Sequence, residues 1–248
     1  MSNPYFQFKQ FTIQQDRCAM KVTTDACLFG AWSVEEVKSQ IPMAIGTKVK
    51  NILDIGSGTG LLSLMLAQKN PEVKILAIEI DEDAKTQAKE NVDASPWKER
   101  IDTIEGDVKD YCFPEKFDVI ISNPPFYEKE IRSETDNKNV AHHSENLTLE
   151  ELLNVIKTNL NRNGSFLLLL PYKRNEEAKQ LFKDQELSIS KILFIRQSLK
   201  HDYFRIFLKG DLRIKEKETE FDEMSIWDEQ QQYTKEFVRL LKDYYLHL

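Results

Sequence analysis

The chain has 248 residues, of which 41% are hydrophobic and 30% charged, and its formal net charge is −7. These values are typical of an ordinary globular protein with a sizeable core, and no apolar run approaches the roughly 18 residues of a membrane span. The N-terminus lacks the basic and apolar stretches of a secretory signal. The three cysteines form no Cys-x-x-Cys pair and the four histidines have no ligand spacing, which indicates reduced thiols in a cytoplasmic protein without a metal.

Residues 1–46 form a leader ahead of a regular α/β pattern. In the leader, Phe6, Phe8, Phe11 and Ile13 alternate with polar residues, which predicts short strands, and residues 26–38 have helical periodicity. From residue 47 to 248, strand-like runs alternate with amphipathic helical runs. The expected strands are 51–55, 74–80, 101–105, 117–122, 165–170, 189–196 and 203–208, and the expected helices are 61–69, 83–93, 148–161, 175–184 and 230–245. We expect the leader and the α/β domain to form one compact unit.

The strand runs predict the topology of the sheet. Continuous apolar stretches such as residues 166–170 indicate strands buried on both faces, as in a parallel sheet with helices on both sides. Only residues 197–202 connect the last two strands, and so short a connection requires an antiparallel pair. We therefore predict a Rossmann-like seven-stranded, mostly parallel sheet with one antiparallel strand.

A glycine-rich loop follows the first strand of this domain. It reads Asp54-Ile55-Gly56-Ser57-Gly58-Thr59-Gly60. Glycines at a strand end allow close approach of the backbone to a ligand. A dinucleotide fingerprint would need glycine at position 61 and a phosphate loop would need Gly-Lys-Ser/Thr, and neither is present. The loop therefore indicates a nucleoside cofactor without a pyrophosphate.

Acidic residues follow the next two strands. Glu79 lies 19 residues past Gly60, where a carboxylate can accept hydrogen bonds from both ribose hydroxyls, and Asp81 is an alternative at the same place. Asp107 follows the third strand and is a candidate for reading the adenine amino group. A helix N-cap is the alternative role for an aspartate after a strand.

The tetrapeptide Asn123-Pro124-Pro125-Phe126 follows the fourth strand. Asn123 and Pro124 each precede a proline, which favours extended geometry and makes this backbone stiff. A stiff loop can preorganise acceptors toward a planar amino group, and Phe126 can stack on a base. A proline-rich turn that merely ends a strand is the structural alternative.

The glycine loop resembles motif I of S-adenosylmethionine-dependent methyltransferases, and the tetrapeptide resembles the catalytic loop of their amino-methylating class. The resemblance implies a class I methyltransferase fold. It implies that the Asn123 side-chain oxygen and the Pro124 carbonyl accept hydrogen bonds from the reacting NH2 group. It also implies that Asp54 helps to hold the ammonium of the cofactor. The implied cofactor residues are Thr24, Asp25, Asp54, Gly56, Ser57, Gly58, Gly60, Glu79, Asp107 and Asn123, and the implied catalytic residues are Asn123, Pro124, Pro125 and Phe126.

The leader carries a narrower resemblance. Residues 8–13, 16–22, 24–25 and 30–32, together with the block 61–68 and the C-terminal pattern 233–246, are similar to bacterial tRNA1(Val) adenine-N6-methyltransferases. This family modifies the adenine on the 3′ side of the anticodon. The resemblance implies a tRNA substrate and a leader in which Thr24 and Asp25 cover the methionine end of the cofactor. We expect a cytoplasmic, metal-free monomer that does not bind membranes.

Three other functions share these motifs. A glutamine N5-methyltransferase acting on a release factor would use the same loop, but the leader is too short for the helical domain of that class. A DNA adenine N6-methyltransferase would need a separate base-reading domain. A tRNA-binding module without turnover is the non-enzymatic alternative, against which the two intact motifs argue.

Candidate RNA contacts come from charge alone. Residues 171–215 contain eleven Lys or Arg and six Asp or Glu, although the whole chain is acidic. Such a basic stretch is compatible with a polyanionic partner, and a solvated face is the alternative. The candidates are Tyr127, Lys173, Arg174, Arg196, Lys200 and Arg205. They predict an affinity that falls with salt.

Overall fold

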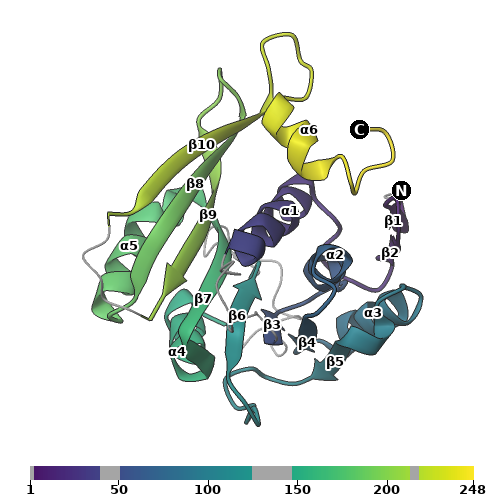
Figure 1. Ribbon diagram of the computed structural model, residues 1–248, viewed down its shortest axis with the longest axis vertical. Helices are drawn as coiled ribbons and strands as arrows, with labels where there is room; N and C mark the ends of the chain where they lie inside the picture. Colours follow the sequence, from purple (N-terminus) through teal and green to yellow (C-terminus); the bar gives the residue numbers. More distant parts are fainter. Residues whose placement is uncertain (1–2, 40–50, 125–146, 213–217) are drawn as a thin grey trace, which may run out of the picture.

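A computed structural model describes residues 3–39, 51–124, 147–212 and 218–248. Its centre is an eight-stranded sheet in the order β10-β8-β9-β7-β6-β3-β4-β5 (Figure 1). The strands are β3 (Asn51–Ile55), β4 (Lys74–Glu79), β5 (Ile101–Glu105), β6 (Phe117–Ser122), β7 (Leu160–Pro171), β8 (Ser188–Ser198), β9 (Tyr203–Asp211) and β10 (Glu220–Trp227).

The direction of the strands confirms a mostly parallel sheet with one reversed strand. β9 is antiparallel to both β7 and β8, and the other pairings in the sheet are parallel. The prediction of seven strands was wrong, because β10 adds an eighth strand beside β8. β10 is an edge strand with one buried face, which carries Met224 and Ile226. The acidic residues that alternate along it made the segment resemble an exposed loop in the sequence.

Helices cover both faces of the sheet, as predicted (Figure 1). One hydrophobic core joins the sheet to α1 (Thr24–Ser39), α2 (Leu61–Lys69) and α6 (Lys235–Leu241). The other core joins it to α4 (Leu149–Asn159) and α5 (Asn175–Asp184). α3 (Glu82–Asp93) packs against β5 and β4. Strands such as β6, buried almost throughout, have both faces covered in this way.

The leader and the C-terminus meet at one side of the molecule (Figure 1). The strands β1 (Tyr5–Gln7) and β2 (Thr12–Gln14) form the expected short hairpin, and a bridge joins Phe8 to Tyr245. The hydroxyl of buried Tyr244 donates to the Met65 carbonyl of α2 at 3.1 Å. These contacts join the leader to the C-terminal segment, and the C-terminal segment to α2. The proposed boundary at residues 46 and 47 lies outside the described residues.

The C-terminal helix is shorter than predicted. It begins after Thr234, whose hydroxyl caps the Phe237 amide, and it ends at Leu241. Residues 228–232 form a turn instead of a first helical segment. In this turn the Asp228 carboxylate accepts from the amides of Gln230 and Gln232, each at 2.9 Å. Local hydrogen bonds to an aspartate side chain compete with helix formation in this way.

Candidate active site

The glycine loop and the Asn-Pro-Pro-Phe loop leave the sheet side by side. Ile55 of β3 and Ser122 of β6 are partners in parallel strands, and the Ser122 hydroxyl donates to the Ile55 carbonyl at 2.8 Å. Gly56 and Asn123 therefore begin two neighbouring loops about 5 Å apart. Asn123 is half-buried and Pro124 is buried. The other predicted residues of this loop, Pro125, Phe126 and Tyr127, lie outside the described residues.

The glycine loop requires glycine for conformational reasons. Gly56, Gly58 and Gly60 have φ of 67°, 53° and 79°, in the left-handed region that side chains disfavour. The amides of Gly56 and Ser57 donate to the Ile78 carbonyl at 2.9 and 3.2 Å, which fastens the loop to β4. A Cβ placed on Gly56 or Gly58 would meet nothing within 4 Å. This side of the loop is therefore open to a ligand.

Asp54 is the buried carboxylate below this loop. Its side chain is fully buried, Oδ2 accepts from the Ser63 hydroxyl at 2.7 Å, and Oδ1 has no protein partner. Burial raises the pKa of Asp54 to about 7, which the Ser63 hydrogen bond partly offsets. The hydroxyl of buried Ser57 also has no partner. An unsatisfied buried carboxylate is a site for a cation or a donor.

Glu79 at the end of β4 faces the same loop. One carboxylate oxygen accepts from the Gly58 amide at 2.8 Å, and the other accepts from the Ile80 and Asp81 amides at 3.0 and 3.2 Å. Asp81 points elsewhere, because its side chain caps α3 by accepting from the Ala84 amide at 2.8 Å. Of the two ribose candidates, Glu79 therefore touches the glycine loop and Asp81 is engaged in a helix cap.

Asp107 extends the row of polar groups by one strand. It follows β5, whose Glu105 pairs with Glu79 of β4. Its Oδ1 accepts from the Lys109 amide at 2.9 Å, and Lys109 Nζ lies 3.5 Å from Oδ2. The structure thus places Asn123, the glycine loop, Glu79 and Asp107 at the carboxyl ends of four consecutive strands. In open α/β sheets, ligands bind outside these ends.

The leader reaches the same edge of the sheet. The leader residue Cys18 is buried here, and this burial, with a smaller effect of the Glu79 charge, raises its pKa to about 11. The Arg17 amide donates to Gln87 of α3 at 3.1 Å. Thr24 and Asp25 begin α1, and Asp25 accepts from the Arg205 guanidinium at 2.7 Å. The predicted cofactor residue Asp25 and the predicted RNA residue Arg205 are thus ion-paired.

Asn91 is a residue that sequence reasoning missed. It is buried on α3, accepts from the Gln14 amide at 2.8 Å, and donates to the carbonyls of Gln14 and Thr59, each at 2.9 Å. One amide therefore ties the leader, α3 and the glycine loop together. The sequence feature that points to this role is a pair of amide side chains, Gln87 and Asn91, which lie one turn apart on the inner face of an amphipathic helix.

The predicted RNA residues lie around the ends of β7, β8 and β9. Arg196 donates to Ser225 at 3.0 Å and to Glu223 at 2.9 Å. Arg174 forms two hydrogen bonds with Glu177, at 2.6 and 2.7 Å. Lys173 and Lys200 are exposed. The three arginines of this set each pair with a carboxylate, Arg205 with Asp25 at the start of α1. Because they are exposed, Lys173 and Lys200 are its more accessible cations.

Comparisons with known proteins agree with this arrangement. The methyltransferase small domain family matches residues 19–187. A tRNA1(Val) (adenine(37)-N6)-methyltransferase of Bacteroides thetaiotaomicron is 38% identical over 253 residues that cover 100% of both chains. The protein of the same name from Flavobacterium johnsoniae is 36% identical over 98% of this chain and 100% of the relative. This chain belongs to the tRNA1(Val) (adenine(37)-N6)-methyltransferase family.

Solved structures show the fold of this family member to be that of class I methyltransferases. An S-adenosylmethionine-dependent methyltransferase from Clostridium acetobutylicum has a TM-score of 0.54 at 13% identity, covering 77% of this chain and 93% of that one. A protein from Agrobacterium tumefaciens described as a predicted O-methyltransferase has a TM-score of 0.66 at 15% identity, covering 88% of this chain and 95% of that one. The class I fold predicted from the sequence is confirmed.

The described parts of the chain, residues 3–39, 51–124, 147–212 and 218–248, carry neither a metal-binding cluster nor a membrane-spanning helix. Within those ranges, no group of three or more His, Cys, Asp or Glu side chains is arranged to hold a metal ion. Of the helices that the structure describes, none has the length and apolar character needed to cross a bilayer.

Proposed function

We propose that this protein transfers a methyl group from S-adenosylmethionine to the exocyclic N6 of an adenine in tRNA, with adenine 37 of tRNA1(Val) as its target. One observation carries the proposal. The open glycine loop and Asn123-Pro124 leave adjacent strands, joined by the Ser122 hydrogen bond to Ile55, so a cofactor on one loop lies beside acceptors on the other. The names of the full-length relatives support the choice of substrate.

The residues present fit the cofactor. The open space at Gly56 and Gly58 would accommodate its amino-acid part, and the unpartnered Oδ1 of Asp54 would accept from its ammonium. Glu79 would accept from the two ribose hydroxyls, and Asp107, one strand further, would read the adenine. Thr24 and Asp25 would cover the methionine end from the leader. When bound, the cofactor supplies an electrophilic methyl group on a sulfonium that is also the leaving group.

The work left to the protein is to place and activate a weak nucleophile. The lone pair of an adenine amino group is delocalised into the ring. The Asn123 side-chain oxygen and the Pro124 carbonyl accept from its two N–H groups, which favours a tetrahedral nitrogen and stabilises the developing positive charge. Pro124 locks its own φ and restricts Asn123. Phe126, outside the described residues, is assigned to stacking on the adenine.

An anticodon-loop adenine is already unpaired, so moving it into the site requires little unstacking energy.

The cysteines bear on the location of the protein in the cell. Cys18, Cys27 and Cys112 are free thiols, two of them buried, which is consistent with the reducing cytoplasm. We propose that the protein acts there as a monomer and uses no metal.

The experiment that tests this function identifies the product. Purified protein is incubated with labelled S-adenosylmethionine and total tRNA from a strain that lacks its own copy of the enzyme. We expect N6-methyladenosine in the anticodon loop of a valine tRNA by mass spectrometry. Parallel reactions contain a release factor or DNA in place of tRNA, and label in either of them, with none in tRNA, would overturn the proposed substrate. RNA binding without label in any of the three would favour a binding module.

A pair of isosteric variants separates the two ribose candidates. Glu79→Gln keeps one acceptor oxygen but loses the charge and the second acceptor, so we expect the Kd for S-adenosylmethionine to rise about 10- to 100-fold. Asp81→Asn is the matched control, because asparagine caps a helix as well as aspartate does, and its Kd should stay close to that of the parent. Isothermal titration calorimetry measures both. A larger loss in Asp81→Asn would assign the ribose to Asp81.

A further inference from the structure

A cluster of aromatic side chains lies outside the site described above. Tyr172, which follows β7, lies 5.4 Å from Tyr203 of β9 and 5.9 Å from Phe194 of β8, measured between ring centres. Phe194 and Tyr203 are 5.2 Å apart, and Phe221 of β10 stacks on the outer side of Phe194 at 6.3 Å. Tyr172 is 37% exposed and Phe221 61%. Exposed aromatic groups gathered in one place mark an interaction surface.

The cluster continues the edge of the sheet that carries the proposed active site. From β6, which is followed by Asn123, the sheet order is β7, β9 and β8. Tyr172 follows the end of β7, and Tyr203 begins β9 opposite Arg196 near the end of β8. Neighbouring strands are about 4.8 Å apart, and Tyr203 lies five residues beyond Leu208, which is level with Ser122 through the shared neighbour β7. Tyr172 and Tyr203 therefore lie on the order of 15 to 20 Å from the end of β6. A substrate held at Asn123 would reach them with its adjacent parts.

Cations lie beside the rings, Arg196 on β8 and Lys173 after the end of β7. The Arg196 guanidinium lies 5.3 Å from the centre of the Tyr203 ring, where Glu223 and Ser225 hold it. Tyr203 also donates to Glu223. Lys173 directly follows Tyr172 and is exposed. Rings and cations in one strip match an RNA strand, because the rings bind base faces and the cations bind phosphates.

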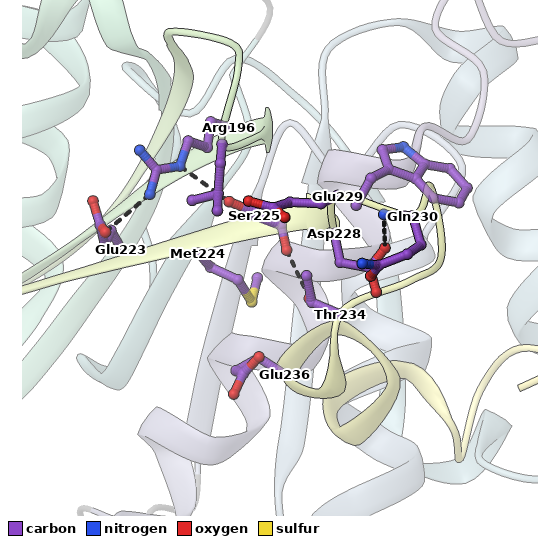
Figure 2. Close-up of a pocket in the computed structure, with 11 residues that line it drawn as sticks. Arg196, Glu223, Met224, Ser225, Asp228, Glu229, Gln230, Thr234 and Glu236 are labelled. Atoms are coloured by element: carbon purple, nitrogen blue, oxygen red, sulfur yellow. Dashed lines mark hydrogen bonds and ion pairs between the residues drawn. The ribbon is translucent and has the colours of Figure 1, made fainter.

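Acidic residues limit the strip on its outer side. Phe221 is flanked by Glu220, Asp222 and Glu223 on β10. Beyond Arg196 lies a pocket of about 400 Å³ whose lining includes the acidic residues Glu223, Asp228, Glu229 and Glu236 (Figure 2). Phosphates are repelled from this side. The charge pattern therefore directs a polyanion across Tyr172 and Tyr203, between the active site and β10.

We propose that Tyr172 and Tyr203 form a stacking platform for unpaired nucleotides adjacent to the methylated adenine. The inference rests on the proposed function, since it extends the substrate path of that same site. Stacking on these rings is independent of base identity, because every base has a π-face. The platform thus supplies affinity and orientation for an anticodon loop, and the acceptors at Asn123 and Pro124 select the amino group.

Variants at Tyr172 test the platform. Tyr172→Leu removes the ring and keeps an apolar side chain, and we expect about tenfold weaker binding of an anticodon stem-loop RNA. KM for tRNA should rise by a similar factor with kcat nearly unchanged, because the ring does not touch the reacting atoms. Tyr172→Phe should restore both values. Phe221→Leu is the matched control, an exposed ring of the same cluster on its acidic side, and should behave as the parent.

A crosslinking experiment gives a readout independent of turnover. Stem-loops with 5-iodouridine at each loop position in turn are irradiated with the parent protein, and the crosslinked peptides are identified by mass spectrometry. We expect crosslinks at Tyr172 or Tyr203. Crosslinks confined to other segments, or an unchanged RNA Kd in Tyr172→Leu, would overturn the platform even if the parent methylates tRNA. Conversely, a parent that binds the stem-loop through these tyrosines but transfers no methyl group would overturn the proposed function alone. Protein dimers that dissociate in Tyr172→Leu, with no effect on RNA, would assign the surface to a second copy of the chain.

Discussion

Replacing Asn123 by alanine is expected to lower methyl transfer to tRNA about a thousandfold, while binding of S-adenosylmethionine persists. The amide oxygen is one of two acceptors that stabilise charge only as the amino nitrogen is methylated, and removing one such group typically costs 10²- to 10³-fold in rate. Cofactor binding persists because the glycine loop, Asp54 and Glu79 remain. Single-turnover transfer and calorimetric titration of the cofactor measure the two effects separately.

Two further variants make this result specific. Asn123→Gln retains the amide but displaces it by one methylene, and a misplacement of about 1 Å can cost 10²-fold, so we expect a large loss here too. Asn159→Ala removes an equally half-buried asparagine from the end of α4, where its amide donates to the Val155 carbonyl at 2.9 Å. It should transfer methyl groups at the parental rate. Retained activity in Asn123→Ala would contradict the proposed mechanism.

The strands that carry the site were predictable because they are buried on both faces. The runs expected at 51–55 and 117–122 are β3 and β6 with the same bounds. A continuous apolar run followed by glycine or proline marks both the strand and its end, and parallel strands bring such ends to one edge. The sequence alone therefore predicts that the two motifs lie at the same edge of the sheet. The same reasoning extends to Glu79 and Asp107, which follow strands in the same way.

Features that depend on tertiary contacts between distant segments could not be predicted. Asp25 and Arg205 are 180 residues apart, and their ion pair exists because α1 packs against β9. Charge counting assigned Arg205 to RNA, since the sequence gives no partner for it. β10 was missed for a related reason: its burial depends on the long neighbour β8, and its own alternation of acidic and apolar residues is that of an exposed segment.

Stability and cofactor binding are expected to depend on pH in opposite directions through Asp54. Burial raises its pKa to about 7 in the folded protein, from an ordinary value of 3.8. The folded state therefore retains a proton that the unfolded state has lost, and the contribution of Asp54 to stability falls as pH rises from about 4 to 7. In Asp54→Asn, which keeps an acceptor for the Ser63 hydroxyl, this slope is absent. The free energy of unfolding of the variant, relative to that of the parent, should therefore rise by roughly 3 kcal/mol between pH 5 and pH 8. Urea unfolding of both proteins without cofactor measures this difference.

The same carboxyl group should make cofactor binding stronger as pH rises. Only ionised Asp54 attracts the ammonium of S-adenosylmethionine, and that amine remains charged below its own pKa of about 7.7. A carboxyl group with a pKa near 7 is ionised to a much larger extent at pH 7 than at pH 5.5, so binding should be roughly tenfold tighter at pH 7. The ammonium of the ligand then neutralises the buried carboxylate. Asp54→Asn should bind weakly with no such slope. A parental Kd that does not change with pH, alongside the expected unfolding behaviour, would show that Asp54 is buried without holding the ammonium. Its unpartnered Oδ1 and the open face of the glycine loop are the reason to expect the opposite result.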